Sequence, residues 1–80
     1  MTYTVYIVKD VGGRLYKGMT NNLPRRLAEH RRGKTKTTSR MVMITIAYTK
    51  QFDNFEDARK HELYLKSAAG RRFLAEQLGG

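Results

Sequence analysis

The 80-residue sequence predicts an α+β fold in which the elements follow the order ββαβαα. Two segments rich in β-branched and aromatic residues flank the pair Gly12-Gly13, a pattern typical of a β-hairpin over residues 3–20. A third such segment runs from Met41 to Phe52, and asparagines precede the helical segments on either side of it. No repeat or linker divides the chain, so we expect a single domain over residues 1–80.

The predicted hairpin carries one tyrosine on each strand, Tyr6 and Tyr16. The residue numbers of two residues that pair directly across a hairpin always add up to the same sum. Two side chains lie on one face when their own sum has the same parity, and the sum for these two tyrosines is even. A loop with an odd number of residues therefore places both phenols on one face of the sheet. The pair Gly12-Gly13 suits a three-residue loop with a bulge.

The first predicted helix follows the hairpin and ends near Gly33. Asn21 or Asn22 can cap it, because an asparagine side chain accepts hydrogen bonds from the free N–H groups of a first helical turn. Arg26 and His30 are separated by four residues, so they share one stripe of this helix. Residues 34–40 follow as a polar, basic loop.

Two helical segments are predicted after the third strand. Asn54 caps the first of them, which runs to about Ser67. Gly70 separates it from a last amphipathic turn or two that carries Phe73, Leu74 and Leu78.

The net charge of +9 at pH 7 is concentrated in one half of the chain. Residues 1–40 hold ten Lys and Arg against two acids, and residues 25–40 hold seven against Glu29 alone. Such a patch attracts polyanions, with nucleic acid first and an anionic membrane second, although a basic face that only keeps the protein soluble remains the alternative. The residues predicted to contact nucleic acid are Lys17, Arg25, Arg31, Arg32, Lys34, Lys36 and Arg40.

Composition excludes several other classes of protein. The chain has no cysteine, so neither a disulfide nor a zinc site with thiolate ligands can stabilise it. No apolar run approaches the roughly 20 residues of a membrane-spanning helix, and the N-terminal segment lacks the pattern of a signal peptide. We therefore expect a cytoplasmic, soluble protein.

Glu62 interrupts an apolar stripe of the helix that Asn54 caps. On a helical wheel it falls between Ala58 and Leu65, and a carboxylate that faces a core is costly unless something compensates its charge. A divalent metal or an arginine from the first helix would do so. The alternatives are a structural Glu–Arg ion pair and a side chain that swings to the helix edge. Tyrosines in strands, and a single arginine or histidine, likewise have ordinary structural roles.

The joint arrangement is more specific than any of these residues alone. Nine residues separate Tyr6 from Tyr16-Lys17-Gly18; Arg26 stands ten positions after the second tyrosine, His30 four further on, and Glu62 in a later helix. This order and spacing resembles the GIY-YIG nuclease domain over nearly the whole chain. The small standalone bacterial members are similar also through the segments 65–67 and 70–74.

The chain departs from the family pattern in three respects. Thr4 stands at the glycine of the first motif, and Lys17 at the apolar middle residue of the second. Lys17 alternates to the face opposite Tyr16, where we expect it to be exposed to solvent and to add to the DNA-binding surface. The late polar asparagine of some family nucleases has no counterpart here.

The resemblance implies a three-stranded antiparallel sheet flanked by helices, with five catalytic residues on one concave surface: Tyr6, Tyr16, Arg26, His30 and Glu62. It implies a metal-dependent DNA endonuclease that repairs or processes branched or nicked DNA with low sequence specificity. Glu62 would hold Mg²⁺ or Mn²⁺, one tyrosine would position or deprotonate the attacking water, and Arg26 would stabilise the charged phosphorane.

Three alternatives stay open at this point. The domain could bind nucleic acid with little or no catalysis, or it could act on RNA, because a surface that reads phosphates does not distinguish RNA from DNA without contacts to the 2′-hydroxyl. A partner protein could supply substrate specificity, since 80 residues leave no room for a separate recognition domain.

Overall fold

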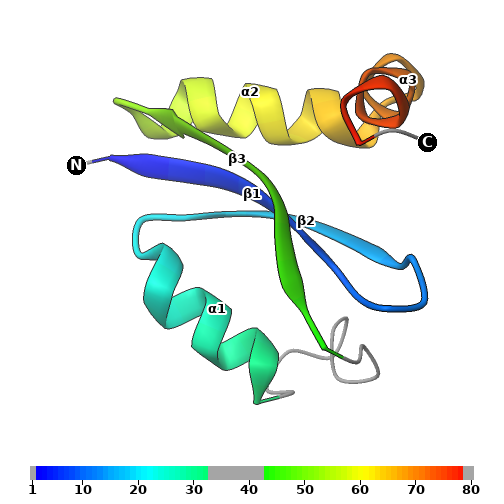
Figure 1. The fold of residues 1–80 in the computed structure, drawn as a ribbon. Coiled ribbons are helices and arrows are strands. Elements are labelled where there is room, and N and C mark those ends of the chain that lie inside the picture. Colours follow the sequence, from blue (N-terminus) through cyan, green and yellow to red (C-terminus); the bar gives the residue numbers. More distant parts are fainter. Residues whose placement is uncertain (1, 33–42, 79–80) are drawn as a thin grey trace.

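The computed structural model describes residues 2–32 and 43–78, and it has the predicted order ββαβαα (Figure 1). The three strands form one antiparallel sheet in the order β2-β1-β3, with β1 in the centre. The predicted fold class is therefore confirmed. The elements are β1 (Tyr3–Lys9), β2 (Leu15–Thr20), α1 (Leu23–Arg31), β3 (Thr45–Phe52), α2 (Phe55–Lys66) and α3 (Ala68–Gln77).

The hairpin between β1 and β2 has the loop that its glycines predict. The Asp10 amide donates to the Arg14 carbonyl at 3.1 Å, which leaves three residues at the tip. Gly13 has a φ of +86°, a conformation that costs glycine little. The Asp10 carboxylate accepts hydrogen bonds from the Gly12 and Arg14 amides at 3.0 and 2.8 Å and so holds the loop closed.

Strand β3 begins at Thr45, so the prediction that it starts at Met41 is wrong where the structure describes the chain. Met43 has a φ of +54°, which takes the backbone out of the extended conformation before the strand begins. Ile44 nevertheless packs into the core beside Tyr6 and Val8, and this apolar residue made the strand look longer. Positions 41 and 42 lie outside the described residues.

The sheet separates two packed layers (Figure 1). Val5 and Ile7 of β1 face α2 and α3, where they contact Ala58, Leu65 and Leu74. The alternate residues Tyr6 and Val8 face α1, packed with Tyr16, Leu23 and Leu27. Alternation along the central strand therefore assigns each of its side chains to one of two different helical layers.

Asparagine caps fix the starts of α1 and α2. Of the two candidates for α1 it is Asn22 that accepts from the Arg25 amide, at 3.1 Å. The Asn54 side chain accepts from the Asp57 amide at 2.8 Å. Both bonds satisfy N–H groups that the helix itself leaves without a partner.

The break between the last two helices lies at Ser67, not at Gly70 as predicted. Ser67 has an extended ψ of 168°, ends α2 and caps α3, and its hydroxyl accepts from the Gly70 amide at 3.1 Å. Gly70 lies inside α3, where an added Cβ would stand 1.9 Å from the Tyr64 carbonyl oxygen. Close helix packing, rather than helix termination, is what requires glycine at this position.

Candidate active site

A hydrogen bond between β1 and α1 forms the centre of the candidate site. The Tyr6 hydroxyl lies 2.7 Å from His30 Nε2, and the two side chains are 0% and 1% exposed. When Nε2 carries no proton, it accepts this bond from the phenol. His30 comes from the last turn of α1, on the stripe that faces the sheet. A strand and a helix are thereby joined through two polar side chains in the core.

Tyr16 completes an aromatic group on this face of the sheet. Its ring centroid lies 4.8 Å from that of His30 and 6.3 Å from that of Tyr6. The register explains the contact, because Tyr6 pairs with Gly18 and Tyr16 with the neighbouring Val8, so the two tyrosines are diagonal neighbours. Unlike Tyr6, Tyr16 is only half-buried.

Gly18 makes room for both phenols. A Cβ at this position would stand 2.7 Å from the Tyr6 hydroxyl oxygen and 3.0 Å from Cε1 of Tyr16. The first distance is shorter than real Cβ contacts and the second is tighter than most of them, so a side chain here would displace the Tyr6 ring. The glycine of the second motif is therefore required by the geometry of the tyrosine pair.

Arg26 is the cation of this cluster. Its guanidinium forms an ion pair with Glu29 at 3.4 Å, one turn along α1. Hydrogen bonding with the Tyr6 hydroxyl, and secondarily with Tyr16, raises the pKa of Arg26 above its ordinary value, although burial opposes the rise. Glu29 is a member of the site that sequence reasoning did not identify. Its position three residues after Arg26 was the available signal.

The surroundings keep both Tyr6 and His30 neutral near pH 7. Burial raises the pKa of Tyr6, and the nearby Tyr16 adds to this, while the hydrogen bond with Arg26 acts in the opposite direction. Burial also lowers the pKa of His30, and the positive charge of Arg26 lowers it further. In this state the cluster holds two neutral hydrogen-bonding rings beside one fixed positive charge.

A groove of about 410 Å³ opens beside Arg26. It lies where the end of β2, the first turns of α1 and the start of α2 meet, and Arg25 and Arg26 both line it. Two guanidinium groups on one wall suit the oxygens of a phosphodiester, because each offers N–H donors in a planar fork. The other lining residues are Tyr3, Met19, Thr20, Asn21, Glu29 and Phe55.

Glu62 lies on α2, the helix that covers the opposite face of the sheet. Its side chain is 9% exposed and pairs with Arg59 at 2.7 Å and with Lys66 at 3.5 Å, both on the same helix. These cations differ from the arginine of the first helix that the sequence suggested. The negative charge of Glu62 is one of the weaker causes that raise the pKa of Tyr6. The structure thus brings four of the five predicted residues into one cluster, while Glu62 comes from the helix on the opposite face and lies near enough for its charge to act on Tyr6.

Glu62 offers a single carboxylate as a metal ligand, and this fits a metal ion that is bound only weakly by the protein. Within residues 2–32 and 43–78 no group of three or more His, Cys, Asp or Glu side chains could hold one. Mg²⁺, however, is commonly bound by one or two carboxylates, with water and substrate phosphate as the remaining ligands. Arg59 and Lys66 are about half exposed, at 51% and 48%, so both can turn to solvent and release the carboxylate.

The predicted nucleic-acid contacts divide into three groups. Arg25, Arg31 and Arg32 are exposed at α1 and its end, on the layer of the tyrosine cluster. Lys17 is half-buried rather than exposed, and it points to the opposite layer, because it pairs with Ile7 across the hairpin. The predicted contacts Lys34, Lys36 and Arg40 lie outside the described residues.

Among the helices that the structure describes, none combines the length and the apolar character needed to cross a bilayer. A cytoplasmic location stays a prediction.

Comparison with known proteins gives one consistent family. The chain is 33% identical over 79 residues to a UPF0213 protein of Natronomonas pharaonis, a match that covers 94% of this chain and 93% of the relative. It is 34% identical over 71 residues to a UPF0213 protein of Staphylococcus haemolyticus, covering 88% and 87% of the two chains. The solution NMR structure of a UPF0213 protein from Bacillus halodurans superposes with a TM-score of 0.60 at 30% identity, over 100% of this chain and 88% of that one. The family model of the GIY-YIG catalytic domain matches residues 2–74, and the chain therefore belongs to the GIY-YIG family of nuclease-type domains.

Proposed function

We propose that this protein is a divalent-metal-dependent endonuclease that hydrolyses phosphodiester bonds in DNA, with low sequence specificity, during repair or processing of branched or nicked DNA. The observation that carries the proposal is the cluster of Tyr6, Tyr16, His30 and Arg26 beside a groove with two arginines.

Arg26 contacts the scissile phosphate in this proposal. Its ion pair with Glu29 is long, at 3.4 Å, and both side chains are partly exposed, so phosphate oxygens can replace the carboxylate as its partner. The guanidinium would then stabilise negative charge that develops on the phosphorane. Its interaction with Tyr6 couples the guanidinium to the cluster.

Tyr16 and Tyr6 have different roles because they differ in burial. Tyr16 is half-exposed, so its hydroxyl can contact the attacking water and help to remove the proton from it. Tyr6 is fully buried and acts through the groups that it touches, since its hydroxyl joins His30 and Arg26. His30 can accept the phenol's hydrogen bond and fix the position of that ring.

Glu62 would hold Mg²⁺ or Mn²⁺, and the bound ion would supply charge stabilisation at the phosphoryl and leaving oxygens. Arg59 and Lys66 must first release the carboxylate. The exposed arginines of α1 would hold the DNA backbone without reading its bases, which accounts for low sequence specificity.

A second candidate function follows from the ion pairs of Glu62. If Arg59 and Lys66 do not release the carboxylate, the domain binds nucleic acid through α1 and cleaves it weakly or not at all. A partner protein would then supply the chemistry or the specificity.

Cleavage by the Glu62→Gln variant tests the proposal. Labelled duplex, flap, nicked and single-stranded DNA, and the matching RNAs, are incubated with the wild type in Mg²⁺, Mn²⁺ or EDTA. We expect cleavage of branched or nicked DNA that needs the metal and is abolished in Glu62→Gln, while DNA binding persists. Removal of the carboxylate leaves only two exposed cations without a partner, so the fold should survive.

Glu56→Gln is the matched control, because Glu56 is an exposed glutamate in the first turn of the same helix. Cleavage by Glu62→Gln at the wild-type rate would overturn the metal site. Metal-dependent binding without cleavage of any substrate would favour the binding module, and cleavage confined to RNA would change the substrate class.

A further inference from the structure

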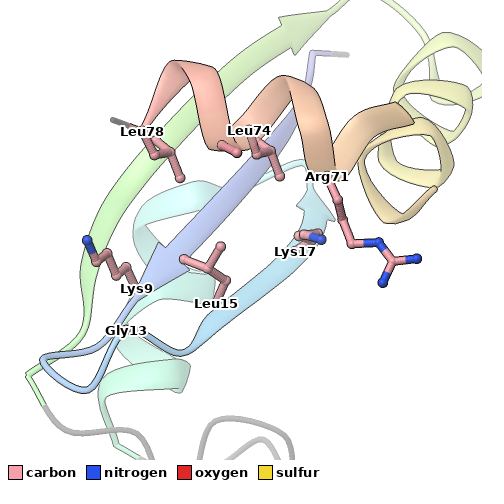
Figure 2. A pocket seen from close by; sticks show the side chains of 8 residues that line it. Lys9, Gly13, Leu15, Lys17, Arg71, Leu74 and Leu78 are labelled. Atoms are coloured by element: carbon pink, nitrogen blue, oxygen red, sulfur yellow. The ribbon is translucent and has the colours of Figure 1, made fainter. Parts of the chain in front are cut away.

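A second groove lies on the layer away from the tyrosine cluster, between α3 and the hairpin of β1 and β2 (Figure 2). Its volume is about 400 Å³, within the range of roughly 300–1,000 Å³ typical of small-molecule sites. Strand alternation separates it from the tyrosine cluster, because it uses Lys9 and Lys17, which point to the face opposite Tyr6 and Tyr16. It is lined by Lys9, Gly13, Leu15, Lys17, Arg71, Leu74, Ala75 and Leu78.

The floor of this groove is aliphatic. Leu74 and Leu78 point from α3 toward the hairpin, and Leu15 points back toward them from β2 (Figure 2). Leu74 is buried in the core, whereas Leu15 is 41% exposed in spite of its apolar side chain. A ligand that covered Leu15 and Leu78 would remove apolar surface from water, a favourable change roughly proportional to the area covered.

The rim of the groove is cationic. Lys9, Lys17 and Arg71 contribute three positive charges, and none of the ion pairs between described residues includes any of them. Lys17 is half-buried, and burial together with the charges of Arg71 and Lys66 lowers the pKa of its ammonium group. An ammonium group held near other cations and partly removed from water is stabilised by a bound anion.

We propose that this groove binds an organic anion whose phosphate or carboxylate group lies between Lys17 and Arg71 and whose apolar body covers Leu15, Leu74 and Leu78. The inference rests on the combination of an aliphatic floor and a cationic rim in one groove. A DNA backbone would use the cations but would leave the leucines exposed, and a neutral apolar ligand would leave Lys17 without a counter-ion. The groove uses none of the residues assigned to the proposed nuclease site, so either proposal can fail without the other.

Methyl NMR of the whole protein with octyl phosphate tests this proposal. Below its micelle concentration the ligand should shift the methyl signals of Leu15, Leu74 and Leu78 in a saturable manner. The methyls of Leu27, on the α1 layer, should stay in place. Inorganic phosphate should bind more weakly, since it cannot cover the leucines, and octanol should bind more weakly because it has no charge. Comparison of octanoate with octyl phosphate shows whether the groove prefers a carboxylate or a phosphate head group. Saturable binding of either of these two anions supports the site.

Lys17→Met and Arg71→Met should each weaken octyl phosphate binding about tenfold, the scale for loss of one charge-assisted hydrogen bond. Leu15→Ser should weaken it while leaving inorganic phosphate unchanged. Lys60→Met is the matched control, because Lys60 is an exposed lysine on α2 that does not line the groove. Equal affinity for octyl and inorganic phosphate, equal affinity for octanol, the absence of shifts at the three leucines, or the same loss in Lys60→Met would overturn the proposal.

Discussion

Two tyrosine–histidine pairs lie on opposite faces of the same sheet, and their comparison shows what distinguishes a site from a structural contact. In the first, Tyr6 of β1 bonds His30 of α1 at 2.7 Å; in the second, Tyr48 of β3 bonds His61 of α2 at 2.9 Å. Burial raises the pKa of both phenols and lowers the pKa of both imidazoles. As isolated pairs they are chemically alike.

Their neighbours differ. In the first pair, Arg26 interacts with the phenol, and the ring of the half-buried Tyr16 lies 4.8 Å from the imidazole. The second pair is surrounded by aromatic rings: Phe52, Tyr64 and Phe73. The cation near His61 is Lys50, which lies 5.6 Å from the centre of the Phe52 ring. A phenol bonded to an imidazole is thus common to both pairs, and a guanidinium whose charge acts on the phenol marks the candidate site.

The largest expected difference is in the cleavage rate after deletion of each hydroxyl. Tyr6→Phe should lower the rate about 10²-fold, because Arg26 and His30 lose the group that aligns them and small displacements of reacting groups have effects of this size. Tyr16→Phe should lower it by about 10²-fold or more, as expected for lost acid–base help. Tyr48→Phe should leave it unchanged. Single-turnover cleavage in Mg²⁺, with circular dichroism as a check on folding, measures all three.

Full activity in both Tyr6→Phe and Tyr16→Phe would make the first pair a structural contact like the second. A loss of activity in Tyr48→Phe without a loss of stability would instead extend the site to the second pair.

A smaller effect is expected when the guanidinium is replaced by an ammonium group. Arg26→Lys keeps the charge but loses the planar fork that bonds phosphate and phenol together, so we expect a fall in cleavage of about tenfold, equivalent to about 1.4 kcal/mol. Lys50→Arg is the control at the second pair and should have no effect. The ratio of the cleavage rates of the wild type and Arg26→Lys measures how much the planar fork contributes. Wild-type activity in Arg26→Lys would mean that Arg26 acts through its positive charge alone.

The smallest effect concerns pH. Both histidines have folded pKa values below about 6.5, chiefly through burial and secondarily through Arg26 for His30 and Lys50 for His61. The unfolded chain therefore binds protons that the folded chain does not. The contribution of the two neutral histidines to the free energy of unfolding is complete above about pH 6.5. It is lost as the pH falls below this value and through the lowered pKa values of the folded state. Thermal unfolding between pH 7.5 and 5 should show this decline.

NMR titration of the two imidazoles resolves the causes. Arg26→Met should raise the pKa of His30 and leave that of His61 in place, and Lys50→Met should do the reverse. If neither variant moves its histidine, burial alone sets both values, and the charges that distinguish the two pairs have no effect on them.

Much of this architecture could be predicted from local patterns. Gly12-Gly13 and the even sum of Tyr6 and Tyr16 predicted the hairpin and the shared face, because strand alternation has a fixed period of two. Asn54 marked the start of α2 through the chemistry of its side chain. The i, i+4 spacing of Arg26 and His30 placed both on one side of α1, since helical geometry fixes that relation.

Other features depended on contacts between segments distant in the sequence. Glycine commonly ends helices, so the sequence alone predicts a helix break at Gly70, whereas the close approach of its backbone to Tyr64 decides its role. Alternation predicted that Lys17 points away from Tyr16, but its partial burial depends on how the helices pack on that face of the sheet.

The sequence by itself determined the order of elements, the shared face of the two tyrosines and the stripe of Arg26 and His30, because each follows from the short-range geometry of strands, turns and helices. The tertiary structure alone decided that Tyr6 bonds His30, that Glu62 is buried, and that three cations surround an aliphatic groove. Burial, partner and local charge depend on how α1, α2 and α3 pack on the sheet, and no pattern within one element specifies that packing.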